Sequence, residues 1–248
     1  MRKSIIAILM TFCLSIMTYA QTPRDRATEL KEQAQSSLNQ KDYIKARYLF
    51  KKAYEAFATR ENYPQAIECG VQANALYVRE NFYKEGFELC RDMDQLIWAG
   101  EQNQKKVFYD LRFLVNKERL QMYTALKNPA QAKTQLNKLE ETANLAKNDS
   151  LTEVLLYTKA NYYYTFNQNA QGDACFRKLI NQYKEKKDYA KVNDCYKNLI
   201  GIARKANNAR LMEHTYESYI VWTDSVKALT AQDELNAVSY THLRAHET

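Results

Sequence analysis

Glycine and proline are scarce in this chain, with 5 glycines and 3 prolines among 248 residues. Turns between β-strands depend on these residues, so an all-β or α/β fold is disfavoured. Ala, Leu, Lys, Gln and Glu are abundant instead, and all of them favour helices. Pro64 and Pro129 fall between apolar-periodic stretches, and Ser150 followed by Glu153 predicts a capping box at a helix start. The composition predicts an all-α protein.

Histidine is also scarce, which bears on catalysis and on metal binding. Of the 3 histidines, His242 and His246 lie near the C-terminus, so only His214 occurs in the body of the chain. A single histidine cannot supply the histidine pair of common zinc sites. The sequence also lacks a glycine-rich loop of the kind that holds phosphate. We therefore expect no enzymatic activity, no cofactor and no metal site, with a catalytic pair of His214 and a cysteine as the weaker alternative.

Residues 1–20 have the composition of a secretory signal peptide. The basic residues Arg2 and Lys3 precede an apolar run from Ile5 to Ile16, and small residues occupy the two positions that signal peptidase reads. The run is shorter than the roughly 20 apolar residues of a membrane span. The prediction is cleavage after Ala20 and export to the periplasm, and an uncleaved membrane anchor is the alternative.

Residues 238–248 resemble a translated sequencing adapter. The stretch reads Val-Ser-Tyr-Thr-His-Leu-Arg-Ala-His-Glu-Thr, which is too long a match to expect by chance. Segments of this origin are excluded from fold reasoning. The expectation is that the native sequence is interrupted near Ala237, and a natural polar tail is the alternative.

The positive charge of the chain is spread out. The formal net charge is +7, and basic pairs such as Lys51-Lys52 and Lys105-Lys106 lie on helical stretches beside acidic residues. Such pairs are typical of solvated helix faces and not of a continuous basic stripe. We expect no nucleic-acid partner.

A pattern of three residues recurs along the chain: a small residue, a large one four positions later, and another three positions after that. The first members recur at intervals of roughly 40 positions, with one longer interval between the second set and the third. The spacing within a set places its residues on one face of a helix, where the small residue lets a neighbouring helix approach. The sets are Ala46, Phe50 and Ala53; Gly86, Cys90 and Met93; Ala132, Leu136 and Leu139; Gly172, Phe176 and Leu179; and a weaker fifth, Met212, Tyr216 and Tyr219.

Each set follows another stretch with an apolar face at helical spacing, such as Leu30, Ala34 and Leu38 before the first. The repeating unit is therefore a pair of helices that occurs five times. One pair cannot bury its own apolar face, whereas stacked pairs share a continuous core. Five pairs are enough for an independently stable stack.

The segment from Tyr43 through Ala46 and Phe50 to Ala53 resembles the second helix of the tetratricopeptide repeat. The resemblance implies a right-handed α-solenoid of about five antiparallel helix pairs over residues 21–226. The interval here exceeds the period of that family, which is roughly 34 residues, and this implies longer helices or larger loops. A protein or peptide partner is the expected ligand of such a solenoid.

By the same resemblance, the first helix of each pair lines a concave groove. Aromatic, amide and cationic side chains there would suit an extended peptide or an acidic ligand. Tyr163 is assigned to the packing face instead. The alternative is that the tyrosines pack inside the fold and the cations are merely solvated. The candidate groove residues are Lys117, Gln121, Tyr157, Asn161, Tyr164, Lys197 and Arg204.

Four cysteines follow the signal segment, and the members of each successive pair are separated by about half of the repeat interval. If a turn falls midway, each pair lies at matching heights on adjacent antiparallel helices. Disulfides between Cys69 and Cys90 and between Cys175 and Cys195 are then conceivable in an exported protein. The alternative is that the cysteines are buried as small apolar residues.

Residues 205–237 resemble the junction at the end of exported sensor regions in membrane-bound histidine kinases or helix-turn-helix regulators of Gram-negative bacteria. Tyr216, Tyr219 and Trp222 are followed by Asp224-Ser225, and residues 227–237 continue a helical pattern that implies a linker helix or coiled coil. The resemblance implies a signal-input domain, with a membrane connection only through a missing C-terminal segment and a homodimer through the C-terminal helix as a further option. A free-standing periplasmic or surface scaffold is the alternative.

Overall fold

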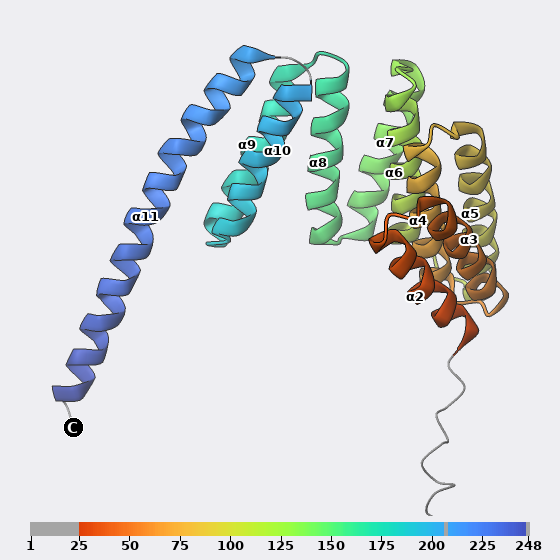
Figure 1. Ribbon diagram of the computed structural model, residues 1–248, viewed down its shortest axis with the longest axis horizontal. Coiled ribbons are helices and arrows are strands. Elements are labelled where there is room, and N and C mark those ends of the chain that lie inside the picture. The colour runs from red at the N-terminus through yellow and green to blue at the C-terminus, as the bar shows by residue number, and fades with distance from the viewer. Residues whose placement is uncertain (1–24, 206–207, 247–248) are drawn as a thin grey trace, which may run out of the picture. The chain divides into compact units, whose positions relative to one another are not determined.

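The computed structural model of the protein describes residues 25–205 and 208–246 (Figure 1). Within these ranges every regular element is an α-helix, so the all-α prediction is confirmed. The ten helices follow one another as five successive pairs, which fits a helical-repeat fold. They are α2 (Arg26–Asn39), α3 (Tyr43–Thr59), α4 (Tyr63–Arg79), α5 (Tyr83–Gln104), α6 (Tyr109–Ala125), α7 (Pro129–Ala146), α8 (Asp149–Thr165), α9 (Asn169–Glu185), α10 (Tyr189–Lys205) and α11 (Ala209–His246).

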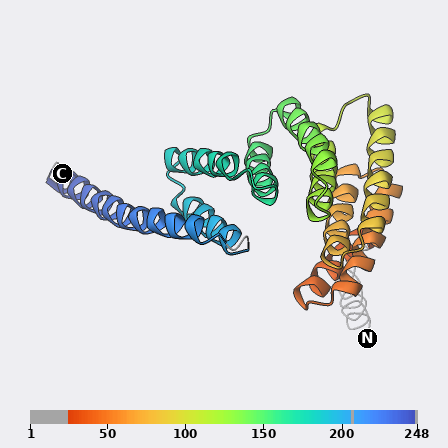
Figure 2. The ribbon, with the colours of Figure 1, turned by 90° about the horizontal axis from the view of Figure 1, so that it is seen from above.

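The chain divides into two compact units. The first unit, residues 1–122, contains α2 to α5 and most of α6. The second unit, residues 123–248, contains the end of α6 and α7 to α11. Figure 2 shows the helices of the first unit in red to yellow-green and those of the second in green to blue.

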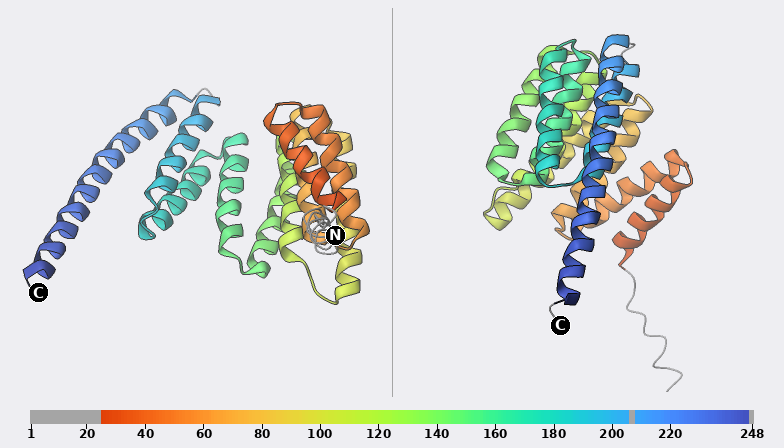
Figure 3. Two further views of the ribbon diagram at one scale, coloured as in Figure 1. Left: turned by 60° about the horizontal axis from the view of Figure 1, so that its bottom comes forward. Right: turned by 90° about the vertical axis from the view of Figure 1, so that its left-hand side faces the viewer.

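In the first unit, each of α2, α3 and α4 packs against the helix that follows it. Neighbouring helices run antiparallel because the turns between them are short (Figure 3). Phe50, Ile67 and Met93 come from three successive helices and are at most 1% exposed. Leu111 and Val115 bring α6 into the same core. Burial of each such side chain stabilises the fold by roughly 1.5–3 kcal/mol.

In the second unit, α7 packs against α8, α8 against α9, α9 against α10, and α10 against α11. Its core contains Leu156 from α8, Phe176 and Leu179 from α9, and Val192 from α10. Trp222 of α11 is 5% exposed and closes this core at the last helix. The unit is thus held by contacts between successive helices.

The turns between helices share one backbone design. Lys41 has a φ of 63° and ends α2, and the carboxylate of the next residue, Asp42, accepts a hydrogen bond from the backbone N–H of Lys45. The left-handed residue closes one helix, and at most of these turns an Asp or Asn cap opens the next. The exceptions include α5 and α9, which begin after Phe82 and Gln168 without a side-chain cap bond. Most of these turns follow one another at about half of the repeat interval, because each repeat contains two helices. The residues with positive φ are Lys41, Glu61, Asn81, Lys105, Lys127, Lys147, Asn167 and Lys187.

The connection from α5 to α6 accounts for the one longer interval in the repeat. α5 has 22 residues, against 17 in α4 and in α6, and residues 105–108 separate it from α6. Glu101 of α5 fastens this longer connection, because its carboxylate accepts hydrogen bonds from the Phe108 backbone N–H at 2.8 Å and the Arg112 Nε at 2.7 Å. The Arg112 guanidinium holds the pKa of Glu101 below its ordinary value, although burial alone would raise it.

The residues of the repeated sets lie where helices meet. In the fifth set, Tyr216 is 41% exposed, and α11 instead buries Thr215 and Trp222. The fifth set therefore matches the buried pattern of the other sets least well, as it also matches their sequence pattern least well. All twelve members of the other sets are buried: Ala46, Phe50, Ala53, Gly86, Cys90, Met93, Ala132, Leu136, Leu139, Gly172, Phe176 and Leu179.

The predicted signal peptide, residues 1–20, lies outside the described residues. α11 is one helix of 38 residues that runs through the positions predicted as boundaries, 227 and 238. Across the described residues, none of the helices combines the length and the apolar composition needed to cross a membrane.

Candidate interaction site

The seven predicted groove residues are divided between the two units. Lys117 and Gln121 lie on α6 within the first unit, and the other five lie on α8 and α10 of the second. Gln121 is exposed. Lys117 is half-buried, with its Nζ 3.0 Å from Oε1 of Glu118, a carboxylate that is only 1% exposed. Lys117 therefore neutralises a buried charge that would be costly to leave unpaired.

Glu118 has a second partner in the first unit. Its Oε2 accepts a hydrogen bond from Nδ2 of Asn74, and the two atoms are 3.0 Å apart. Asn74 belongs to α4 and is fully buried. This polar pair ties α4 to α6 through the core.

Two of the predicted groove tyrosines lie inside the second unit. Tyr164 is 7% exposed, and its hydroxyl donates a hydrogen bond to Asp173 of α9. Tyr157 is half-buried, with its ring edge-on to Phe176 at 5.6 Å and its hydroxyl 3.0 Å from the Cys195 Sγ. Burial is the main cause that raises the pKa of both phenols. This corrects the expectation of an aromatic groove wall, because the residues fill the space between α8 and its neighbours.

The three polar candidates of the second unit are exposed. Asn161, Lys197 and Arg204 all face solvent. Lys197 lies 4.0 Å from Asp194, one turn earlier on the same helix, which is a weak ion pair in water. These three side chains are accessible to a partner.

The tyrosine run on α8 is arranged differently from the prediction. Tyr162 is 4% exposed and packs against Tyr163 at 5.3 Å and Phe166 at 5.0 Å between ring centroids. Tyr163, which the sequence assigned to the packing face, is only half-buried. The run therefore has Tyr162 and Tyr164 inside, because helices pack on α8 from more than one side.

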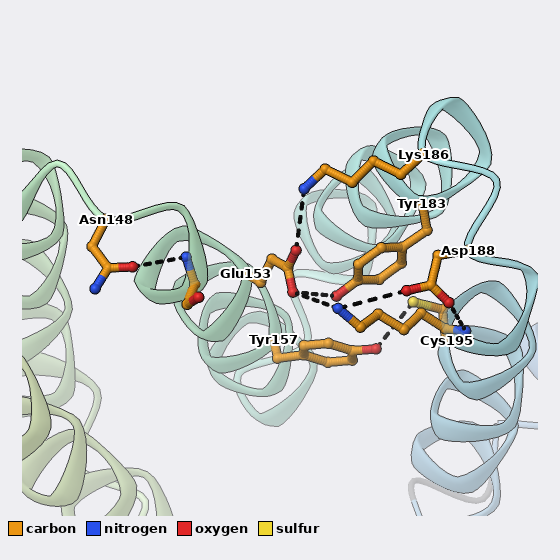
Figure 4. A network of polar contacts seen from close by, with 9 residues as sticks. Asn148, Glu153, Tyr157, Tyr183, Lys186, Asp188 and Cys195 are labelled. Carbon is orange, nitrogen blue, oxygen red and sulfur yellow. Dashed lines mark hydrogen bonds and ion pairs between the residues drawn. The ribbon is translucent and has the colours of Figure 1, made fainter.

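Glu153 forms the centre of a polar network that joins three helices (Figure 4). Its Oε2 accepts a hydrogen bond from the Tyr183 hydroxyl of α9 at 3.0 Å and from Nζ of Lys191 of α10 at 3.4 Å. Nζ of Lys186 lies 3.5 Å from the other carboxylate oxygen. Burial would raise the pKa of Glu153, but Tyr183 and the two lysines favour the ionised form and lower it.

This network replaces the predicted capping box. The N-cap of α8 is Asn148, whose side-chain oxygen accepts a hydrogen bond from the Ser150 backbone N–H at 3.0 Å. Glu153 reaches across to α9 and α10 instead of back to the start of its own helix. The hydrogen-bond partners of Glu153 lie about 30 and 38 positions away in the sequence, so the local residue spacing does not predict them.

A pocket with a volume of about 240 Å³ opens between α9, α10 and α11. Its buried lining, the floor, is mostly apolar, and its more exposed lining, the rim, carries basic, amide and hydroxyl groups together with the Asp173 carboxylate, which accepts a hydrogen bond from Tyr164. The rim includes His214, the histidine in the body of the chain, which is exposed. The lining residues are Asp173, Phe176, Arg177, Ile180, Asn181, Lys184, Tyr196, Leu199, Leu211, His214, Thr215 and Ser218.

Lys184 connects this pocket with a neighbouring hollow beside Trp222. Its ammonium lies 4.6 Å from the centroid of the Trp222 ring, a cation–π arrangement. The indole N–H donates a hydrogen bond to the Asn193 Oδ1 at 2.9 Å. The aromatic surface at the side of the pocket is therefore held in a fixed orientation.

The four cysteines are free and buried. Neither of the conceivable disulfides is formed, and Cys90 fills a packing position of the repeat. Burial raises the pKa of Cys69 to about 11 and that of Cys90 to about 12. These thiols stay protonated near neutral pH and are poor nucleophiles.

Among the described residues there is no group of three or more His, Cys, Asp or Glu side chains placed to hold a metal ion. No protein-family model matches the chain, and no curated protein is significantly similar to it. The class that the structure defines is therefore the coarse one, an all-α fold compatible with helical repeats.

Proposed function

We propose that this protein is a non-enzymatic interaction module of the tetratricopeptide type that holds a segment of a partner protein. The observation that carries this proposal is the pocket between α9, α10 and α11. It combines an apolar floor with exposed polar groups at its rim, which is the combination that binding sites use for affinity and for orientation.

The pocket favours a peptide side chain over a small metabolite. Its volume of about 240 Å³ lies below the roughly 300–1,000 Å³ of small-molecule sites. Leu211 is half-buried, and together with the edges of Ile180 and Leu199 it forms an apolar contact surface for one large side chain of a partner. Arg177 and Lys184 stand at the rim, where a carboxylate beside that side chain would be stabilised.

A selection experiment tests this proposal. Short random peptides, displayed on phage, are selected on the purified protein and then measured individually by fluorescence anisotropy. We expect a group of peptides whose affinity falls at least about tenfold on Arg177→Glu and on Leu211→Ala, two changes at side chains of the lining that are not fully buried. Lys178→Glu is the matched control, because Lys178 is an exposed cation on the same helix outside the pocket lining. Peptides that bind all variants equally would show that the pocket is not the site.

We also propose that the protein serves as the signal-input part of a larger exported protein. Trp222 of α11 belongs to the core of the second unit, Val226 packs against that core, and the helix ends at His246. Residues 209–237 of α11, which precede the adapter-like stretch, correspond to about 44 Å of helix, whereas α10 has 17 residues. Because the first turns of α11 line the pocket, a change of pose there can be passed along the helix to whatever is attached to it.

The genomic reading frame beyond codon 237 tests the signal-input role. An apolar run of roughly 20 residues, followed by a kinase or DNA-binding region, is the expected result. A stop codon soon after the junction would contradict signal input and would leave the free-standing scaffold.

A further inference from the structure

The outer face of α3 in the first unit carries an uncovered apolar stripe. Ile44 is 69% exposed and Tyr48, one turn later, is 60% exposed. These two residues form the apolar stripe, and the charged residues Lys51, Lys52 and Glu55 follow it on the same face of the helix. Large apolar side chains side by side at this exposure differ from the scattered ones expected on any surface.

The stripe borders a hollow of about 400 Å³. Tyr77 of α4 and Arg47 of α3 line it together with the residues of the stripe. The Arg47 guanidinium lies 4.8 Å from the Tyr77 ring centroid and 5.1 Å from that of Phe82, and it forms an ion pair with Glu80. These contacts fix Arg47 before any partner arrives, which lowers the entropy lost on binding.

The charges around the stripe have one prevailing sign. Lys45, Lys51 and Lys52 are exposed. The exposed acidic residues of this helix are Glu55 and the N-cap residue Asp42. Glu55 is already engaged, because its Oε2 lies 2.8 Å from Nζ of Lys52. Within the described residues the side chains of Lys45 and Lys51 form no ion pair. The uncompensated charge beside the apolar stripe is positive.

We propose that this face of α3 binds an acidic amphipathic helix of a partner protein. Ile44 and Tyr48 receive its apolar residues at positions i and i+4, and Lys45 and Lys51 pair with acidic residues that flank them. The spacing from Ile44 to Glu55 corresponds to about 16 Å of straight helix, which suits packing of one helix along another. The surface lies in the first unit and does not depend on the pocket proposed above.

A partner with negative charge fits this surface better than a second copy of the chain. The formal net charge of the chain is +7, so two copies repel one another at low ionic strength. A complementary acidic helix is attracted instead, and its association slows as salt screens the charges.

A library of helix-forming peptides tests the proposal. Each peptide is long enough for about four helical turns and is randomised on one face. The library is selected on the wild-type protein after binders of the Tyr48→Ala variant have been removed. The recovered peptides are expected to be acidic, with apolar residues at i and i+4. Their dissociation constants should rise at least about tenfold on Tyr48→Ala and on Lys51→Glu, and also with added salt.

Two matched controls belong to the same unit. Trp98 is 62% exposed on α5, and Lys84 is an exposed lysine of the same helix. Trp98→Ala and Lys84→Glu should leave the affinity unchanged, and circular dichroism checks that every variant is folded. Arg177→Glu in the second unit should also leave it unchanged, which separates this surface from the pocket.

Several results would overturn the proposal. One is recovery of only neutral or basic peptides, or of none that depend on Tyr48. Another is binding of vesicles of phosphatidylcholine and phosphatidylserine that depends on Tyr48 and Lys51 without any such peptide, which would assign the face to a lipid surface. Self-association in sedimentation that Tyr48→Ala abolishes would assign it to a second copy.

Discussion

Replacement of Gly172 by alanine tests whether the small residue of each repeat exists to let helices approach. A Cβ at Gly172 would lie 2.7 and 2.8 Å from two carbons of the Tyr164 ring. That ring cannot move away easily, because it is buried against Phe176 and its hydroxyl is bonded to Asp173. Gly201 is the matched position, since a Cβ there meets nothing within 4 Å.

The two substitutions should change stability in opposite directions. Alanine in place of glycine within a helix gains about 0.5–1 kcal/mol from the lower entropy of the unfolded chain. Gly201→Ala should show this gain alone. At Gly172, overpacking against Tyr164 costs roughly 1–3 kcal/mol and outweighs the gain. A gap of about 2 kcal/mol between the variants corresponds to roughly 5–10 °C in melting temperature.

Trp222 provides the readout, because it is 5% exposed in the core of the second unit. In a Trp98→Phe background it is the remaining tryptophan, and its fluorescence follows urea or thermal unfolding of this unit. In a Tyr164→Leu background the penalty for Gly172→Ala should largely disappear. If Gly172→Ala stabilises the unit as much as Gly201→Ala does, the close-approach reasoning is refuted.

Three further outcomes are expected. Lys187→Gly should stabilise the second unit by up to about 1 kcal/mol, because the left-handed backbone at this position strains any residue with a Cβ. Lys178→Gly, in the middle of α9, is the control and should destabilise the unit by about 1 kcal/mol in the same thermal unfolding experiments. Glu101→Gln should cost about 1–3 kcal/mol near neutral pH. The folded-state pKa of Glu101 is lowered from 4.5, so the stability that its ionised carboxylate contributes is present above that value and is lost as the pH falls through the folded-state pKa. The stabilities of the wild type and of Glu101→Gln should therefore converge in acid denaturation curves. Phe176→Ala should cost about 3–5 kcal/mol in urea unfolding, because Phe176 is 1% exposed and leaves a cavity; a loss under about 1 kcal/mol would contradict its placement in the core.

Part of the molecule could be predicted from short-range spacing. Intervals of three and four residues define one face of a helix whatever surrounds it, so the twelve repeat residues were identified and are all buried. The cap residues at helix starts are a further signal in the sequence. Asp or Asn occurs at the start of several helices and is followed by tyrosine or proline, as at Asp42-Tyr43, Asn62-Tyr63 and Asn128-Pro129. These caps recur mostly at half of the repeat interval and would have located the turns.

Other features depend on which neighbour a helix face meets. The spacing of Tyr157, Asn161 and Tyr164 predicts one shared helix face, but the contacts of α8 with its neighbours decide that Tyr164 is buried and Asn161 exposed. The partner of Glu153 on α9 is likewise distant in sequence.

The amino-acid sequence by itself determined that the chain is helical, where its helices pair, and which small and large residues lie between them, because these properties follow from backbone propensity and the helical period. Only the tertiary structure decided which tyrosines are core, that Cys69, Cys90, Cys175 and Cys195 are free, and that Ile44 and Tyr48 are exposed among the described residues. The physical reason is that a helix can present more than one apolar face, and whether a face is buried depends on contacts between segments that local periodicity does not specify.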